Sequence, residues 1–384
     1  MKKLLKQALL RFGGYTFARN IYTGIEEQRL MQRARKFIRT GLTPLPDMVM
    51  FEPTQRCNLN CRMCFQDHGL MARQRELTPD QIADFFDRYP YLKKVTLIGG
   101  EIFLRSDIMD IIRFLDNTRD IVLSTNATLI HDSDIDMLRH CRHIFGICIS
   151  LDGPKAIHEL IRNAPGSFDA TAHATEELAK CFPVTVNCVI QNDNIKVLPE
   201  VVDLCAALGV RKLNFELERI YSEDIISQTV AVTGLERVDL PVSSKGRSRE
   251  YSLNYLKKKL AECQSRGRGK GIYVIFAPPF RTDSIDACYA GCRRTKIRHL
   301  CQSFSTATIA PDGSLIHCFV IRKTFGNILD TPFDEIWNSQ AANNFRKQLI
   351  MNNLTPLCEN CRSMVPLEKV RLNFAVNPED AKVA

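Results

Sequence analysis

The sequence contains no long hydrophobic run and too little cysteine for a fold built on disulfides. No stretch of about 18 apolar residues occurs, which excludes a membrane-spanning helix. The 15 cysteines among 384 residues are too sparse to staple a chain of this size. The start of the chain is basic, but charged residues interrupt its apolar run and no small-residue cleavage site follows, unlike a signal peptide. Internal repeats and low-complexity tracts are also absent. These absences predict a cytoplasmic protein.

The chain is long enough for two or three domains. Its hydrophobic content of 45% can bury a substantial core without covalent help. Some cysteines cluster at short spacings and others stand alone. The isolated ones are predicted to be small buried apolar side chains in a reducing compartment, and they are Cys141, Cys148, Cys181, Cys188, Cys205 and Cys263.

Positive charge is concentrated at the beginning of the chain. Residues 1–40 hold ten Lys or Arg against Glu26 and Glu27, a net +8 of the total +9. Leu4, Leu9 and Phe12 fall near one helical face with lysines largely opposite, so residues 1–45 are predicted to form a basic amphipathic helical segment. Such a segment suits peripheral contact with an anionic membrane or an acidic partner, and the alternative is a solvated helix that caps the first domain. Nucleic acid is disfavoured because no aromatic residues interleave with the basic ones.

After residue 45, short apolar runs alternate with helical patterns, which is typical of βαβ units and a parallel sheet. Two helix starts are readable: Thr78 opens a capping box, and Ser106 precedes a run of apolar residues. Right-handed crossovers would roll these units into an α/β fold, a partial (β/α)6 barrel over residues 46–220, with its chemistry on the loops that leave the carboxyl ends of the strands. The six predicted strands are 48–53, 94–99, 121–125, 144–150, 184–190 and 212–217.

The rest of the chain reads differently. Residues 221–285 carry basic tracts around one amphipathic helix near 250–264 and are predicted to be a connector. Residues 286–365 contain the second cysteine group and are predicted to be a small metal-stabilised domain. Residues 366–384 are predicted to be a loosely ordered tail.

The first cysteine group follows the first predicted strand, in the stretch "EPTQRCNLNCRMCFQDHG" (52–69), which holds Cys57, Cys61 and Cys64. Thiolates bind soft metals and iron-sulfur clusters. Three thiolates leave one iron of a four-iron cluster without a protein ligand, much as a catalytic zinc keeps one position open. A zinc site and a chance spacing remain alternatives on the cysteines alone.

Further segments at the ends of successive strands resemble the radical S-adenosylmethionine (radical SAM) superfamily. They are "IGGE" (98–101), "STNATL" (124–129) and "SLDGPKAIHELIR" (150–162), each directly after a predicted strand. The resemblance implies that Cys57, Cys61 and Cys64 hold a 4Fe-4S cluster whose open iron binds SAM. It also implies a set of SAM-binding residues, namely Met63, Gly99, Gly100, Glu101, Thr125, Asn126, Ser150, Asp152 and Arg162.

Three members of this set have alternatives. Met63 stands where the family usually has an aromatic residue, and a thioether can also cover an adenine face. Glu101 could equally be a helix-capping carboxylate, and Asp152 a turn residue.

The second cysteine group consists of Cys301 and Cys318 on either side of a "PDG" turn, followed by Cys358 and Cys361 in "CENC". By itself this four-thiolate pattern favours structural zinc. In this context the segment resembles the SPASM or twitch extension of radical SAM enzymes, which implies one auxiliary 4Fe-4S cluster held by the four thiolates. Two further cysteines, Cys288 and Cys292, are predicted to be core residues or to lie beside that site, and the alternative is that one of them joins it as a ligand.

The resemblance implies reductive cleavage of SAM to a 5'-deoxyadenosyl radical that abstracts hydrogen from an unactivated C–H bond, with an electron donor such as flavodoxin or ferredoxin. A second cluster favours a net oxidation or bond-forming modification of a peptide, a protein or a biosynthetic intermediate. A sugar-like or lipid-linked small molecule is the alternative substrate. Phe319 occupies the position where sulfatase-maturing relatives have an aspartate, which argues against that role. A non-enzymatic zinc protein that binds nucleic acid or membrane is a remote alternative, and no catalytic residue is assigned.

Overall fold

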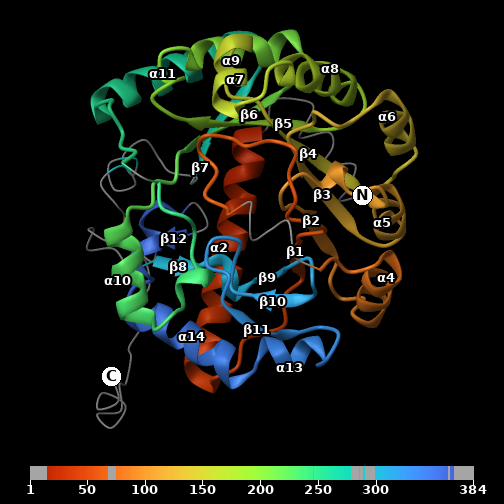
Figure 1. Ribbon diagram of the computed structural model, residues 1–384, viewed down its shortest axis with the longest axis vertical. Helices are drawn as coiled ribbons and strands as arrows, with labels where there is room; N and C mark the ends of the chain where they lie inside the picture. Colours follow the sequence, from red (N-terminus) through yellow and green to blue (C-terminus); the bar gives the residue numbers. More distant parts are fainter. Residues whose placement is uncertain are drawn as a thin grey trace.

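The computed structural model describes residues 15–67, 75–244, 246–277, 285, 289, 299–361 and 364–366. Its centre is a curved sheet in which seven parallel strands follow one another in chain order (Figure 1). The six strands predicted from the sequence are all present, and the α/β partial-barrel prediction is confirmed. The seven strands are β1 (Met48–Phe51), β2 (Lys94–Leu97), β3 (Asp120–Thr125), β4 (Ile144–Ser150), β5 (Val184–Ile190), β6 (Lys212–Leu217) and β7 (Tyr273–Ala277).

Helices cover the outer face of this sheet, as Figure 1 shows. The capping box at Thr78 is confirmed: its hydroxyl accepts from the Gln81 N–H, and Gln81 caps in return. The next helix begins at Ile108, after Asp107 rather than after Ser106, and has no side-chain cap. The outer helices are α4 (Pro79–Arg88), α5 (Ile108–Asp116), α6 (Asp132–Arg139), α7 (Lys155–Arg162), α8 (Ser167–Ala179), α9 (Leu198–Ala207) and α11 (Leu253–Lys270).

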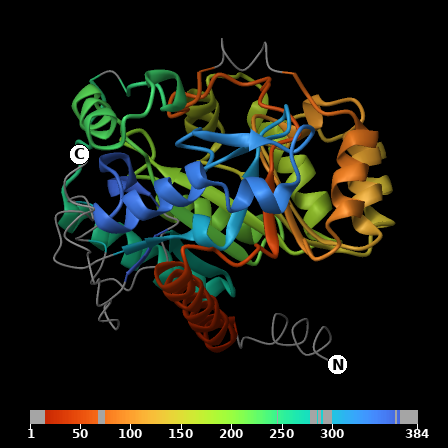
Figure 2. The ribbon, with the colours of Figure 1, turned by 90° about the horizontal axis from the view of Figure 1, so that it is seen from below.

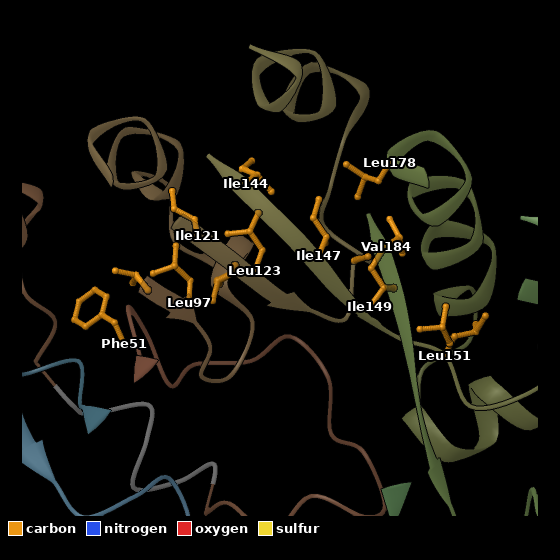
Figure 3. Packing of buried hydrophobic residues seen from close by; sticks show 14 of the residues in the cluster. Phe51, Leu97, Ile121, Leu123, Ile144, Ile147, Ile149, Leu151, Leu178 and Val184 are labelled. Atoms are coloured by element: carbon orange, nitrogen blue, oxygen red, sulfur yellow. The ribbon is translucent and has the colours of Figure 1, made fainter. Parts of the chain in front are cut away.

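The strands alternate between an apolar outer face and a more polar inner face. Figure 3 shows Ile121 and Leu123 of β3 and Ile147 of β4 packed beneath the helices, where all three are fully buried. The inner face instead carries polar side chains near the carboxyl ends of the strands, among them Ser124, Ser150, Asn187, Asn214 and Glu216. The inside of the partial barrel can therefore bind a polar molecule.

The C-terminal domain extends the same sheet. Strand β9 (Thr306–Ile309) pairs in parallel with β1, on the side of β1 that faces away from β2. The "PDG" turn is a hairpin, as predicted, with Gly313 at φ +89° between β9 and β10 (Ser314–Ile316). The remaining elements are β8 (His299–Cys301), β11 (Thr324–Asn327), β12 (Met364–Pro366), α13 (Phe333–Trp337), α14 (Gln340–Met351), η4 (Gln302–Phe304) and η5 (Pro356–Asn360).

The stretch predicted to be a connector carries more structure than one helix. It contains α10 (Glu223–Thr233), η2 (Arg237–Asp239) and α11, which includes most of the helix expected near 250–264. It also contributes β7, which pairs in parallel with β6 and which the sequence patterns did not predict. Between them, β7 and β9 lengthen the barrel sheet at both edges.

The basic N-terminal segment includes helix α2 (Tyr15–Thr40), which lies below the body of the protein in Figure 2. Its Leu30, Ala34 and Phe37 are buried in a cluster that also contains Leu300 and Phe304. This face of the helix is therefore covered by the C-terminal domain. Residues 1–14, with the apolar set predicted there, and the tail from 367 to 384 lie outside the described residues. No helix within the described ranges is both long and apolar enough to cross a membrane.

Candidate active site

The three clustered cysteines lie on the loop that follows β1, at the carboxyl edge of the sheet. The thiols of Cys57, Cys61 and Cys64 are electrostatic neighbours, and the Cys64 N–H donates to the Cys61 carbonyl at 3.1 Å. Burial raises the pKa of Cys57 to about 11, and it raises the pKa of Cys64 as well. Within the described ranges no three His, Cys, Asp or Glu side chains are grouped to hold a single metal ion. Because burial raises the pKa of these thiols, they need positive charge nearby in order to be ionised as thiolates.

The predicted glycine-rich turn packs directly against the stem of the cysteine loop. A Cβ added to Gly99 would lie 2.1 Å from the Thr54 carbonyl oxygen, and one added to Gly100 would lie 2.2 Å from the Arg56 carbonyl oxygen. The turn is also bonded to this stem, because the Gly100 N–H donates to Thr54 at 3.1 Å. Only glycine permits so close an approach of two backbones. The turn thus fixes where the Cys57 loop begins.

Glu101 is fully buried and joins the ends of two strands. Its Oε1 accepts from the Thr125 hydroxyl at 2.6 Å and from the Phe103 N–H at 3.1 Å, while Oε2 accepts from the Asn126 N–H at 2.7 Å. Burial raises the pKa of the carboxyl group. Glu101 is the N-cap of η1 (Ile102–Leu104), so it has the capping role considered above. Contact with the SAM amine stays a prediction, and Oε2 retains one acceptor position for it.

The "STNATL" segment clamps the cysteine loop through a network of side chains. The Asn126 amide donates to Asn58 Oδ1 at 3.0 Å and approaches Cys57 Sγ at 4.0 Å. The Asn58 amide donates in turn to the Thr128 hydroxyl at 2.8 Å. Asn58 and Thr128 were not among the predicted site residues, although both lie within segments used for the prediction, residues 52–69 and 124–129.

Asp152 and Arg162 form a buried ion pair that reaches the cysteines. Arg162 Nε donates to Asp152 Oδ2 at 2.7 Å, and Arg162 Nη1 lies 3.7 Å from Cys61 Sγ. Burial opposes the charge of Arg162, but Asp152 and Cys61 together outweigh it and raise the arginine pKa. His158 lies beside the pair and is uncharged near neutral pH, because burial lowers its pKa to about 4. Arg162 thus places positive charge next to the Cys61 sulfur, and Asp152 is more than a turn residue.

Two predicted SAM-binding residues, Ser150 and Met63, have no side-chain hydrogen bond of this kind to the part of the chain that the structure describes. Ser150 is half-buried at the end of β4, opposite Asn187 in the sheet register. Met63 is half-buried between the second and third cysteines. Their contacts with SAM stay predictions, as do those of the other residues in the set.

The second cysteine group comes together in an apolar cluster of the C-terminal domain. Cys301, Cys318, Cys358 and Cys361 all belong to this cluster, and Cys301 and Cys361 are electrostatic neighbours of each other and of the other two. Burial raises the pKa of Cys301 to about 11 and that of Cys318 to about 12. The Ile321 N–H donates to Cys318 Sγ at 3.2 Å and thereby favours a thiolate. Cys288 and Cys292 lie outside the described residues.

The chemistry of this donor set suits an iron-sulfur cluster in two respects. Four thiols gather in a dry environment, where they require metal to be ionised. In addition, Tyr221 is 1% exposed beside three of these cysteines, and its hydroxyl has no hydrogen-bond partner within the described ranges. A cluster would offer sulfur acceptors to such a buried donor.

The two cysteine sites lie close to each other, a relationship the sequence does not reveal. Phe65 follows Cys64 and Phe319 follows Cys318, and their ring centroids are 6.3 Å apart. A second link joins the same parts, because Arg322 of the C-terminal domain forms an ion pair with the fully buried Glu52 after β1, with an N–O distance of 2.8 Å.

Comparisons with known proteins bear on both sites. A family model described as the radical SAM superfamily matches residues 51–205, and one described as an iron-sulfur cluster-binding domain, SPASM, matches residues 301–362. The chain belongs to the radical SAM superfamily. Within that superfamily it carries a C-terminal SPASM domain, so SAM and 4Fe-4S clusters are its cofactors, as predicted.

Several characterised proteins are similar over most of the chain. An AdoMet-dependent heme synthase of Methanosarcina barkeri is 26% identical over 331 residues, which cover 84% of this chain and 90% of the relative. A PqqA peptide cyclase of Ruegeria pomeroyi is 24% identical over 340 residues, which cover 86% and 82%. Streptococcus suis SuiB, solved with bound S-adenosylmethionine, has a TM-score of 0.60 at 16% identity and covers 83% of this chain and 72% of its own, which shows the shared fold.

Proposed function

We propose that this protein cleaves SAM reductively and uses the resulting 5'-deoxyadenosyl radical to abstract hydrogen from an unactivated C–H bond. The single observation that carries the proposal is the trio of thiols at the carboxyl edge of a parallel sheet, clamped by the glycine turn and by Asn126 in a chain of this superfamily. When bound, the cluster supplies the electron for this cleavage and its open iron supplies the binding position for SAM.

The residues of the chain have separable tasks in this proposal. Arg162 offsets the negative charge that gathers near Cys61. Glu101 and Asn126 hold the strand ends in place, so that the edge of the site is rigid before SAM arrives. The inner polar side chains Asn214 and Glu216, which are hydrogen-bonded at 2.9 Å, lie where a substrate would be oriented.

The reaction is proposed to be a net oxidation or bond formation, because the auxiliary site can accept or relay an electron after hydrogen abstraction. The proposed substrate is a biosynthetic intermediate, and the similarity to a heme synthase over 90% of that relative's length supports an intermediate of heme formation. A peptide is the second candidate, supported by the similarity to a peptide cyclase. A sugar-like or lipid-linked molecule is the third, from the basic N-terminus.

The proposed electron donor is a flavodoxin or a ferredoxin. A cytoplasmic location is also proposed, because Cys188, Cys205 and Cys263 are buried in the core without forming disulfides, which suits a reducing compartment. Peripheral membrane contact would involve the basic N-terminal segment, whose helix α2 leaves Arg35 and Arg39 exposed. The non-enzymatic zinc alternative is not retained, since two family models place this chain among cluster-dependent enzymes.

The test is performed on protein isolated and reconstituted without oxygen. Reduced wild-type protein given SAM should contain two clusters and form methionine and 5'-deoxyadenosine. Cys64→Ala should keep the auxiliary cluster and form no 5'-deoxyadenosine, whereas Cys181→Ala, which changes an exposed thiol, should behave as the wild type. Colourless wild-type protein, or equal 5'-deoxyadenosine formation by Cys64→Ala, would refute the proposal.

A further inference from the structure

Arg219 lies between the two cysteine sites, just beyond the carboxyl end of β6. Its guanidinium carbon is 5.5 Å from the ring centroid of Phe65 and 5.2 Å from that of Phe319. These rings directly follow Cys64 and Cys318, one from each cysteine site. The guanidinium therefore borders the space between the two cysteine sites. A substrate that contacts both sites would have to bind in this space.

Arg219 is half-buried, and two of its three guanidinium nitrogens have no partner among the described residues. Nε and Nη2 of Arg219 are buried and have no hydrogen-bond acceptor within the described ranges. No described carboxylate lies within ion-pair distance of it, and the adjacent Glu218 pairs instead with Arg247. The aromatic rings offset part of the charge but accept none of its hydrogen bonds in the plane of the guanidinium.

The two unpartnered nitrogens form the edge of arginine that binds a carboxylate or phosphate side-on. The same chain uses this edge elsewhere: Nε and Nη2 of Arg105 donate to the two carboxylate oxygens of Asp107, and those of Arg56 donate to Glu76. In Arg219 the equivalent edge has no acceptor among the described residues.

We propose that Arg219 binds an anionic group of the substrate, a carboxylate or a phosphate, and thereby holds the substrate between the two cysteine sites. The proposal rests on the proposed function and deepens it by naming the chemical class of substrate. Arg219 is a positioning and specificity residue, and it takes no part in hydrogen abstraction. A neutral substrate without acceptors would leave these two buried nitrogens unsatisfied.

The experiment measures anion binding rather than turnover. Holoprotein with both clusters is reduced without oxygen and without SAM, and is titrated with glutarate, observed by proton NMR, or with inorganic phosphate, observed by phosphorus NMR. Reduced clusters are paramagnetic, so an anion bound beside them relaxes faster than in solution. Faster relaxation of glutarate alone assigns a carboxylate, and that of phosphate alone assigns a phosphate. Equal effects assign a site for either anion.

The variants decide whether the effect belongs to Arg219. Arg219→Gln should weaken binding of the relaxing anion about tenfold or more, because two charge-assisted hydrogen bonds are lost. Arg219→Lys keeps the charge without the planar edge and should recover only part of the affinity. Arg113→Gln, on the exposed side of α5, is the matched control and should bind as the wild type does. If the Arg219→Gln variant does not bind its clusters, anion binding is judged from the Arg219→Lys variant instead.

The proposal is overturned if neither anion relaxes faster with wild-type protein, or if the effect persists in both Arg219 variants. It is also overturned if Arg219→Gln leaves anion relaxation unchanged and shifts the midpoint potential of the auxiliary cluster, since the guanidinium would then serve that cluster. Because the experiment contains no SAM, its result does not depend on whether the wild-type protein forms 5'-deoxyadenosine.

Discussion

The rings of Phe65 and Phe319 lie 6.3 Å apart, and each belongs to the residue that directly follows a cysteine of a different site. The loop of the first site and the hairpin of the second therefore share one aromatic layer. The buried ion pair of Glu52 with Arg322 joins the same two segments closer to the sheet. The space between the two sites therefore has a common wall.

Gly100→Ala should remove the cluster of the first site and leave the auxiliary cluster in place. The new Cβ would lie 2.2 Å and 2.4 Å from two carbonyl oxygens in the stem of the cysteine loop, so that the stem must move. Iron should fall from about eight to about four atoms per chain, as measured in reconstituted protein. Gly269→Ala, in an open position of α11, is the control and should keep both clusters. Full iron content in Gly100→Ala would show that the stem tolerates the displacement.

Arg162→Gln should destabilise the fold because it leaves the fully buried Asp152 without its cation. Breaking a buried ion pair in this way costs about 3–5 kcal/mol, measurable by urea unfolding without oxygen. Adding Asp152→Asn should recover much of this stability. The double variant should still have a lower midpoint potential at the first cluster, because Cys61 has lost its positive neighbour. If the double variant has the wild-type midpoint potential, Arg162 only neutralises Asp152 and does not influence the first cluster.

Much of this architecture could be predicted from the sequence because its signals are local. The alternation of apolar runs with amphipathic helices located six strands, and the capping box at Thr78 fixed one helix start. The cysteine spacings and the segments after successive strands located both sites. These features depend on neighbouring residues in the chain, so that spacing and residue type are sufficient to recognise them.

The remaining features depend on contacts between residues far apart in the chain. Strand β9 pairs with β1 across more than 250 positions, and nothing within "TATI" specifies that partner. The short β7 follows a helix rich in lysine and arginine, and its five residues give little periodicity. Arg219 looks like any other basic residue in the sequence, and only the fold places it between Phe65 and Phe319.

Glu218 should make the fold less stable as pH rises. Burial raises its folded-state pKa from 4.5 to about 7, although Arg247 and Arg249 oppose the shift. Between these values the folded chain holds a proton that the unfolded chain has lost, so stability falls with rising pH and levels off above the folded pKa. From pH 5.5 to 8 the loss should be about 2 kcal/mol in urea unfolding.

The matched variants separate this contribution from other titrations. Glu218→Gln should flatten the profile by the same amount, since a neutral amide does not titrate. Glu200→Gln, on the exposed face of α9, should leave the wild-type slope. An unchanged slope in Glu218→Gln would mean that other groups carry the pH dependence.

Tyr221→Phe should lower the midpoint potential of the auxiliary cluster. The hydroxyl is buried beside Cys318, Cys358 and Cys361, with no acceptor among the described residues, so a cluster sulfur is its expected partner. A donor stabilises the more negative, reduced cluster. Its loss is worth about 0.5–1.5 kcal/mol, or roughly 20–60 mV for one electron, in an EPR-monitored redox titration. Tyr255→Phe, at a tyrosine that packs against the main core on α11, should leave the potential unchanged. A wild-type potential in Tyr221→Phe would exclude this hydrogen bond.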